Sequence, residues 1–523
     1  MPKDWEEKDT KETPEKTDET GLTRRDWFGF AGAALAATAL PLRFPVAAPS
    51  AEAAAEIAPG IAPGTAPAAA GVSPVMEKLS AYMSEAGSRP LPGNVAQTTK
   101  EHILDTFAAM ISGSKLLPGR RAIQFAQAYG GKPVSTVMAT NMAIGPIEAA
   151  LTNAMMAHAD ETDDSHSASS CHPGCGIIPP ALAIGEQFGV SGTRLIRAVA
   201  LGYDVGTRVT LTLGGGAFEA ESHWSTHTIA PLFGAAAACG SLAGFDAHQM
   251  RLSLGYTAQQ SSGLGAWDRD TQHIQKAFAF GGMAARGGVL STLVIHDGWT
   301  GVEDIFSGAD SFFDAYNPHA NPEGLIDKLG EFYQITRSDI KKWPVASTIQ
   351  AALDAIVLLR KKHPFTADQV RHATVQLPTS LAVIVNNRKM PDICVQQMVA
   401  VMLMDAAVTF HSANDVARMK DSATLRQRAK VTLVPSEELQ RLIPVRAAIV
   451  EITLTDGTRL TERVNHVRGS FMNPMSSEEV AAKARDLITA VLGAAKTSAL
   501  IDTIYNLEKV NDIRELRTLL QKA

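Results

Sequence analysis

Helical periodicity dominates the first long stretch of the chain, from Val75 to about Gly330. Apolar residues recur there at helical spacing in segments of helix length, and glycine or proline separates most of these segments. The predicted helices cover residues 100–112, 121–129, 145–158, 195–212, 231–243 and 248–264. Small residues fill many apolar positions, which favours helices packed closely on one another. No segment here alternates like a strand, so we predict an all-α domain over residues 75–335.

The pattern changes after Lys342. Short segments at residues 373–377, 430–434, 448–455 and 458–464 predict strands. Asp456-Gly457 predicts a hairpin with a type I′ turn between the last two. Helical segments at 348–361 and 394–409 separate the strands. We therefore predict a smaller α+β domain over residues 340–467, followed by helices at 475–492 and 511–520 within residues 468–523. Ser476 or Ser477, followed by glutamates, is the expected cap of the first of these helices.

The first 70 residues differ in composition from the rest. Residues 1–20 are charged and almost devoid of apolar groups, so we expect them to be disordered. Arg24 and Arg25 precede a short apolar run from Phe30 to Leu42 and an Ala/Pro-rich linker, which resembles a twin-arginine export signal. We expect a periplasmic mature protein that begins between Ala48 and Ala70 and has no stable membrane association. An uncleaved anchor or a chance arginine pair is the alternative.

Charge and composition exclude several classes of protein. The formal net charge is -6, and residues 1–20 hold eight acids against four lysines, so the rest of the chain is close to neutral. No basic stripe indicates a nucleic-acid partner or an anionic membrane. With 45% hydrophobic and 20% charged residues, the chain is typical of a globular protein with two or more folding units.

The densest group of polar residues lies between Ala157 and Pro180, in the run A-H-A-D-E-T-D-D-S-H-S-A-S-S-C-H-P-G-C-G-I-I-P-P. It follows a helical face that ends at His158, and Pro173-Gly174 predicts a sharp turn at His172. Burying such groups is costly unless they pair. The run is therefore either a hydrogen-bonded core network or a functional site.

Four cysteines, Cys171, Cys175, Cys239 and Cys394, form no C-x-x-C pair. Because two of them flank His172, a zinc site is one interpretation. Small buried thiols are the interpretation that we favour.

Several motifs, in order along residues 75–492, together resemble the MmgE/PrpD family. They are H-A-D-E-T-D-D-S-H from His158, C-H-P-G from Cys171, G-Y-D-V from Gly202, F-G-A-A-A-A from Phe233, A-Q-Q-S-S-G-L from Ala258, I-K-K-W-P from Ile340 and H-V-R-G-S-F-M-N-P-M from His466. The resemblance implies a mainly α fold, in which the C-terminal helices complete a large all-α domain and an α+β lid domain is inserted. It also implies an active site between the two domains. The expected protein is a homodimer without an organic cofactor that acts on a small di- or tricarboxylate.

The same resemblance implies roles for individual residues. Glu161, Asp163 and Asp164 match the acids of the family's D-x-D-D-T motif, and Ser165 replaces its threonine. His172 resembles the histidine of the His-Pro turn that follows.

Basic side chains complete the predicted site. Lys276 and Lys341 resemble lysines that face the substrate carboxylates, and Arg388 is similar to a lid arginine. Histidine can transfer a proton near neutral pH, and cations can neutralise a polyanionic substrate. We predict that the catalytic residues are His172, Lys276, Ser165, Glu161 and Asp163. We predict that the substrate-binding residues are Lys341, Arg388, Asp164 and His227, with no metal.

Departures from the family pattern leave the reaction open. The lid tyrosine has no counterpart between Gln397 and Val399, and Ala346 and Ser347 stand where a histidine is expected. The main hypothesis is a cofactor-independent lyase or isomerase of dehydratase, decarboxylase or epimerase type. One alternative is a metal-dependent hydrolase that uses acids and histidines of the run from His158 to His172. The other is a non-catalytic periplasmic carboxylate-binding protein.

Overall fold

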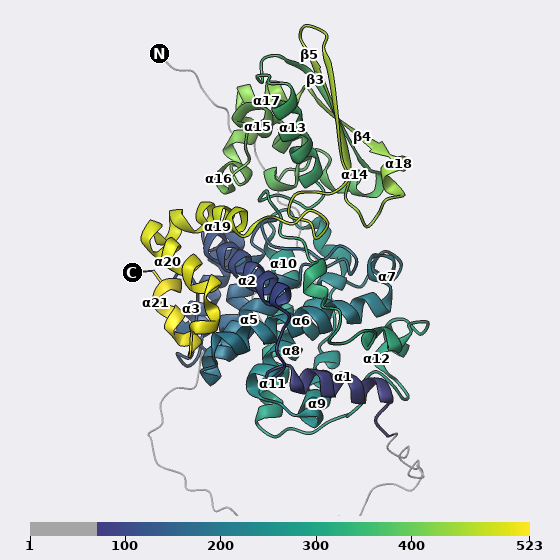
Figure 1. Cartoon of the computed structure of the whole chain (residues 1–523), viewed down its shortest axis with the longest axis vertical. Helices are drawn as coiled ribbons and strands as arrows, with labels where there is room; N and C mark the ends of the chain where they lie inside the picture. Colours follow the sequence, from purple (N-terminus) through teal and green to yellow (C-terminus); the bar gives the residue numbers. More distant parts are fainter. Residues whose placement is uncertain (1–70, 523) are drawn as a thin grey trace, which may run out of the picture. The chain divides into compact units, whose positions relative to one another are not determined.

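The computed structural model describes residues 71–522, so the tail, the twin-arginine-like signal and the linker predicted over residues 1–70 lie outside the described residues. Most described residues are helical, and one sheet of four strands accompanies the helices (Figure 1). The prediction of a mainly α fold with a small α+β part is confirmed.

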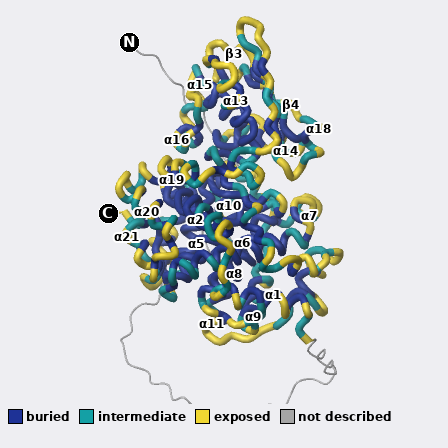
Figure 2. Tube along the Cα trace, viewed as in Figure 1, coloured by how far each residue is buried: buried dark blue, intermediate teal, exposed yellow. Residues whose placement is uncertain are grey.

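A group of long helices forms the core that carries the polar run. Helix α8 packs on α5, α6 and α11, and α4 packs on α5. The bounds of these helices are α2 Gly93–Gly113, α4 Pro146–Ala157, α5 Pro173–Phe188, α6 Gly192–Leu213, α8 Thr226–Ala243 and α11 Met283–His296. Further helices surround them, namely α1 Pro74–Glu85, α3 Leu117–Tyr129, α7 Gly215–Ser222, α9 Ala247–Gln259, α10 Ile274–Ala277 and α12 Phe312–Tyr316. Figure 2 shows that the buried residues concentrate in these central helices.

Helices α6 and α8 meet backbone to backbone because both carry glycine at the crossing. A Cβ on Gly206 would lie 2.2 Å from the carbonyl oxygen of Ala230. A Cβ on Gly234 would lie 2.6 Å from the carbonyl oxygen of Gly202. Any larger residue would push the two helices apart, since close-packed backbone has no room to give.

Two local features of this region bear on the predictions. The turn predicted at His172 is the start of a helix, since Pro173 occupies the first turn of α5, where its missing N–H costs nothing, and His172 is the non-helical cap residue. A small antiparallel pair, β1 Ser135–Thr136 with β2 Ala143–Ile144, occurs where no strand was predicted. Strands of two residues are too short to show alternation.

The α+β part contains a sheet with strand order β4-β3-β5-β6. Strands β3 Val370–Pro378 and β4 Val431–Ser436 run parallel, whereas β5 Ala448–Leu454 pairs antiparallel with β3 and with β6 Arg459–Val464. The predicted hairpin is present, but its turn is not type I′. That turn needs positive φ at both central residues, and only Gly457 has it, at 91°.

Short helices complete the α+β part. They are α13 Gln350–Lys362, α14 Thr379–Val385, α15 Val395–Asp405, α16 Phe410–Ala413, α17 Ser422–Arg428 and α18 Glu437–Gln440.

The C-terminal helices pack on the N-terminal part of the chain. Helix α19 Ser477–Leu492 contacts α2 and is followed by α20 Ala494–Tyr505 and α21 Arg517–Leu520. Ser476 caps α19 through a capping box with Glu479, as predicted. Helix α20 was not predicted.

An apolar helical run from Ile274 to His296 joins α10 to α11. It is long and apolar enough to cross a membrane, but 67% of its most apolar window is buried inside the protein, as in a core helix of a globular protein. Its central turn, η3 Phe278–Gly282, is a π-helix. Such turns insert one residue into a helix and often occur at functional sites.

Candidate active site

The polar run between α4 and α5 meets the segment that leads into the α+β part. The backbones of Ser165 and Asp339 exchange two hydrogen bonds, with N···O distances of 3.0 and 2.7 Å. This bridge brings Lys341, two residues further on, against the acids of the run. Residues that lie far apart in the sequence therefore share one buried cluster.

Glu161 is the acid at which two predicted lysines meet. Lys276 forms a salt bridge with its carboxylate. Lys341 Nζ donates to the backbone oxygen of Glu161 at 2.8 Å and lies 3.7 Å from Oε2. Burial opposes ionisation, but Lys276 and Lys341 outweigh it and hold the pKa of Glu161 well below its ordinary value. Glu161 is therefore a buried carboxylate anion.

Asp163 links two histidines to the same cluster. His158 Nδ1 lies 2.9 Å from Asp163 Oδ2, and His172 Nδ1 lies 3.2 Å from Oδ1. Lys341 Nζ lies 3.6 Å from Oδ1. Although burial raises the pKa of Asp163, the two histidines and Lys341 lower it well below its ordinary value. An ionised carboxylate accepts only, so both histidines carry their proton on Nδ1.

His172 is consequently a neutral imidazole with its basic nitrogen available. Burial, followed by the charge of Lys341, lowers the pKa of His172 to about 4. With Nδ1–H directed at Asp163, the lone pair is on Nε2, which makes no hydrogen bond within residues 71–522. The arrangement is that of a general base oriented by a carboxylate.

Phe280, in the π-helical turn, packs against several rings of the site. His227 stacks on it with ring centroids 4.1 Å apart, and His158 stacks on it at 4.4 Å. Trp267, in the turn η2 Gly265–Arg269, meets it edge-on at 4.7 Å, and Lys276 Nζ lies 5.1 Å from its centroid. Phe280 therefore fixes the orientation of these side chains.

Asp164 points into a separate buried network. Its carboxylate accepts hydrogen bonds from Tyr203 OH at 2.5 Å, His102 Nδ1 at 2.7 Å and Gly174 N at 2.9 Å. Both carboxylate oxygens are thus used within the protein. Asp164 therefore positions the start of α5, and its predicted contact with substrate stays a prediction.

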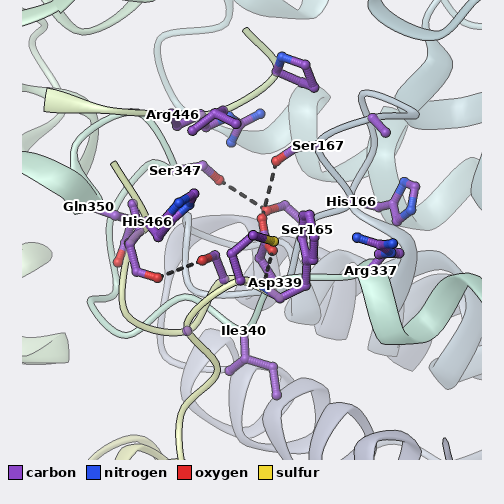
Figure 3. A pocket seen from close by; sticks show the side chains of 18 of the residues that line it. Ser165, His166, Ser167, Arg337, Asp339, Ile340, Ser347, Gln350, Arg446 and His466 are labelled. Atoms are coloured by element: carbon purple, nitrogen blue, oxygen red, sulfur yellow. Dashed lines mark hydrogen bonds between the residues drawn. The ribbon is translucent and has the colours of Figure 1, made fainter. Parts of the chain in front are cut away.

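Three further predicted residues lie around the cluster. Ser165 Oγ lies 3.5 Å from Ser347 Oγ, at the wall of a cavity (Figure 3). The ring of His227 stacks on Phe280, and burial lowers the pKa of His227 well below its ordinary value. Arg388 donates to the backbone oxygen of Asp268 at 3.0 Å and makes no contact with Glu161 or His172.

Sequence reasoning missed an acid from the α+β part. Asp392, in the turn η6 Pro391–Ile393, is 5% exposed. Burial and the negative charges of Glu161 and Asp160 raise the pKa of Asp392 to about 8, so its carboxyl group is protonated at neutral pH. Nothing in the surrounding P-D-I-C sequence indicates this, because the cause is tertiary burial. His273, whose ring nitrogens are both buried without hydrogen bonds in the described chain, was missed for the same reason.

Two subsets of the cluster have the spacing of metal ligands. They are His158, Glu161 and His273, and His158, Asp163 and Cys175. His158 Nε2 and both ring nitrogens of His273 have no hydrogen-bond partner in the described chain, which suits binding of a metal ion. The ammonium groups of Lys276 and Lys341 beside Glu161 oppose it, because a cation there would meet two like charges. All four cysteines are free and buried, which agrees with the favoured interpretation of small buried thiols.

A cavity of about 350 Å³ adjoins the cluster. Among the predicted site residues, Ser165 and Lys341 line it, whereas Glu161, His172 and Lys276 do not. The rest of its wall comes mainly from residues 332–350 and 444–472. Ser165 and Lys341 thus form a wall shared by the buried cluster and an accessible space.

Comparison with known proteins shows the family of this chain. Residues 77–324 match the MmgE/PrpD N-terminal domain, and residues 343–509 match the MmgE/PrpD C-terminal domain. A cis-aconitate decarboxylase of Aspergillus terreus is 25% identical over 482 residues, which cover 86% of this chain and 96% of that protein. The cis-aconitate decarboxylase-like protein oryM of Aspergillus oryzae is 25% identical, with 85% of this chain and 97% of that protein covered. Cis-aconitate decarboxylase of Mus musculus is also 25% identical, with 82% and 90% covered. The chain therefore belongs to the MmgE/PrpD family.

Proposed function

We propose that this protein is a cofactor-independent lyase or isomerase that acts next to a carboxylate in a small di- or tricarboxylate. The observation that carries the proposal is the neutral His172, whose Nδ1 is fixed by Asp163 and whose Nε2 is available. Two lysines lie in the same cluster. A base beside fixed cations suits the removal of a proton from a carbon that bears a carboxylate.

In this mechanism the lysines prepare the substrate for deprotonation. A substrate carboxylate near Lys341 delocalises the electron pair that the departing proton leaves, and the ammonium group stabilises the resulting enolate-like charge. The same carboxylate offsets the positive charge that depresses the pKa of His172. Binding therefore moves His172 toward the pKa that suits a general base at neutral pH.

Asp392 is suited to the opposite role. A carboxyl group that is protonated at neutral pH donates a proton to a leaving hydroxyl group or to a carbanion. The relatives that are cis-aconitate decarboxylases favour loss of a carboxylate over the other reactions. In that case the C–C bond breaks, carbon dioxide leaves, and the electron pair left on carbon takes up a proton.

Hydrogen exchange tests this proposal directly. The purified protein is incubated in heavy water with a panel of di- and tricarboxylates, and NMR follows the signal of the proton next to the carboxylate and any product. We expect exchange or turnover with at least one ligand, and its loss in His172→Gln. His102→Gln is the control, because His102 is also buried but bonds Asp164 instead of Asp163 and does not line the cavity. Exchange that survives in His172→Gln, or ligands that bind without any exchange, would contradict the proposal.

A metal-dependent hydrolase is the second candidate, favoured by the unpaired nitrogens of His158 and His273. It predicts stoichiometric zinc or another divalent metal in the purified protein and activity that a chelator removes. Metal analysis together with the exchange assay in the presence of EDTA distinguishes the two. Exchange that is unaffected by EDTA favours the lyase or isomerase.

A further inference from the structure

The cavity beside Ser165 and Lys341 has a mainly apolar wall. Figure 3 shows Ile340 among the side chains around it, and the larger of the other apolar members come from two separate segments. They are Phe332, Pro444, Val445, Val467, Phe471 and Met472. At about 350 Å³ the cavity falls in the range of roughly 300 to 1,000 Å³ that is usual for pockets holding small organic ligands. Polar and cationic side chains also line the cavity, but most of its exposed wall area is apolar, so a hydrocarbon group gains free energy by being buried there.

Two cations of the wall form no salt bridge among the described residues, and one of them, Arg337, stacks over the rings of Phe332 and Phe471. Arg446 is half-buried and forms no salt bridge or side-chain hydrogen bond within residues 71–522. Asp339 is the only carboxylate among the described residues that line the cavity. Its oxygens accept hydrogen bonds from Phe471 N at 2.8 Å and Ser167 Oγ at 3.2 Å. Arg446 is therefore left to bind an anionic group of a ligand.

The carboxylates of the buried cluster are already paired with other cations. Its two carboxylates, Glu161 and Asp163, already face the two ammonium groups of Lys276 and Lys341. A substrate that carries two or more negative charges brings an excess, which a further cation must offset. Arg446 is placed to do so across the wall that the cluster and the cavity share.

We propose that the cavity is a specificity pocket for a hydrocarbon substituent, so that the substrate is an alkyl- or aryl-substituted di- or tricarboxylate. One carboxylate meets Arg446, the substituent lies along Ile340, Val445 and Val467, and the reacting end reaches Lys341. The inference rests on the proposed function, because it extends the substrate of that same site.

Binding of a graded series of ligands tests the pocket independently of catalysis. Isothermal titration calorimetry compares butanedioate with its 2-butyl, 2-hexyl and 2-octyl derivatives on the full-length protein. Each methylene group buried in the pocket is expected to tighten binding by about fourfold, until the cavity is filled. Equal affinity across the series, or no binding by any member, overturns the inference.

Two variants locate the effect in the cavity. Val445→Trp fills the space, so the gain with chain length should disappear while butanedioate still binds. Val434→Trp is the matched control, since Val434 and Val445 are both 37% exposed and only Val445 lines the cavity. Arg446→Gln should weaken every member of the series by a similar factor of about tenfold or more, because it removes a contact with charge. If affinity still rises with chain length in Val445→Trp, the inference is overturned. Failure of the proposed function is a different result, namely ligands that bind without proton exchange.

Discussion

Replacement of Lys341 by methionine should raise the pKa of His172, because the lysine charge opposes protonation of the imidazole. Lys341 Nζ lies 3.6 Å from Asp163 Oδ1, which lies 3.2 Å from His172 Nδ1, so the two nitrogens are within about 7 Å of each other. Two unit charges at this distance repel by roughly 2 kcal/mol at an effective dielectric constant of about 20. One pKa unit corresponds to about 1.4 kcal/mol, so the expected rise is between one and two units.

The assay is an NMR titration of isotope-labelled histidine, with His172→Gln used to assign the signal. Wild-type His172 should titrate near pH 4, where its pKa lies, and the Lys341→Met signal should titrate at clearly higher pH. Lys276→Met is the control, because Lys276 pairs with Glu161 and its charge affects His172 less than those of Lys341, Asp163 and His158. A His172 pKa that is unchanged or lower in Lys341→Met would refute the reasoning, and with it the coupling between substrate charge and the base.

Further predictions concern stability, measured as the free energy of unfolding in urea. Tyr203→Phe removes the hydrogen bond to the Asp164 carboxylate and should lower the free energy of unfolding by about 1–3 kcal/mol. An unchanged free energy of unfolding would contradict this prediction. Gly206→Ala should cost at least about 1–3 kcal/mol, because its Cβ would lie 2.2 Å from a backbone oxygen, whereas Gly93→Ala, with nothing within 4 Å, should be close to neutral. Burial lowers the pKa of His166 from 6.5 to about 4, so the unfolded chain binds the extra proton and stability falls as pH drops from 6.5 towards 4. In His166→Gln, this loss between pH 7 and 4.5 should be smaller by about 2–3 kcal/mol, and an equal loss in both proteins would contradict it.

Long helices could be predicted from the sequence because periodicity and caps agree there. The segment predicted at residues 195–212 forms α6, whose ends are set by the cap Ser191 and by Gly214 with a φ of 112°. The π-helical turn at residues 278–282 could not be predicted in this way. It depends on Phe280, which is held by rings from α4, α8 and η2 that no local pattern reveals.

Residue spacing alone predicted only part of the candidate site. Glu161 meets Lys276 and Lys341 across 115 and 180 residues of sequence, so only the resemblance to a family brought these positions together. The structure gathers Glu161, Asp163, His172 and both lysines into one cluster. Arg388 lies outside this cluster, and its guanidinium donates a hydrogen bond to the backbone oxygen of Asp268 in η2. Asp392 was missed because its chemistry arises from burial and from two nearby acids instead of from its sequence neighbours.

The glycine crossing of α6 and α8 divides the site into a fixed half and an adjustable half. Tyr203 and His227 stand on these two helices, whose axes cannot separate or slide while their backbones touch at Gly206 and Gly234. Adjustment to substrates of different size is therefore expected from the cavity wall, at residues 332–350 and 444–472, instead of from these two helices. A substitution in that wall should therefore change which ligands bind without moving the helices that hold Tyr203 and His227.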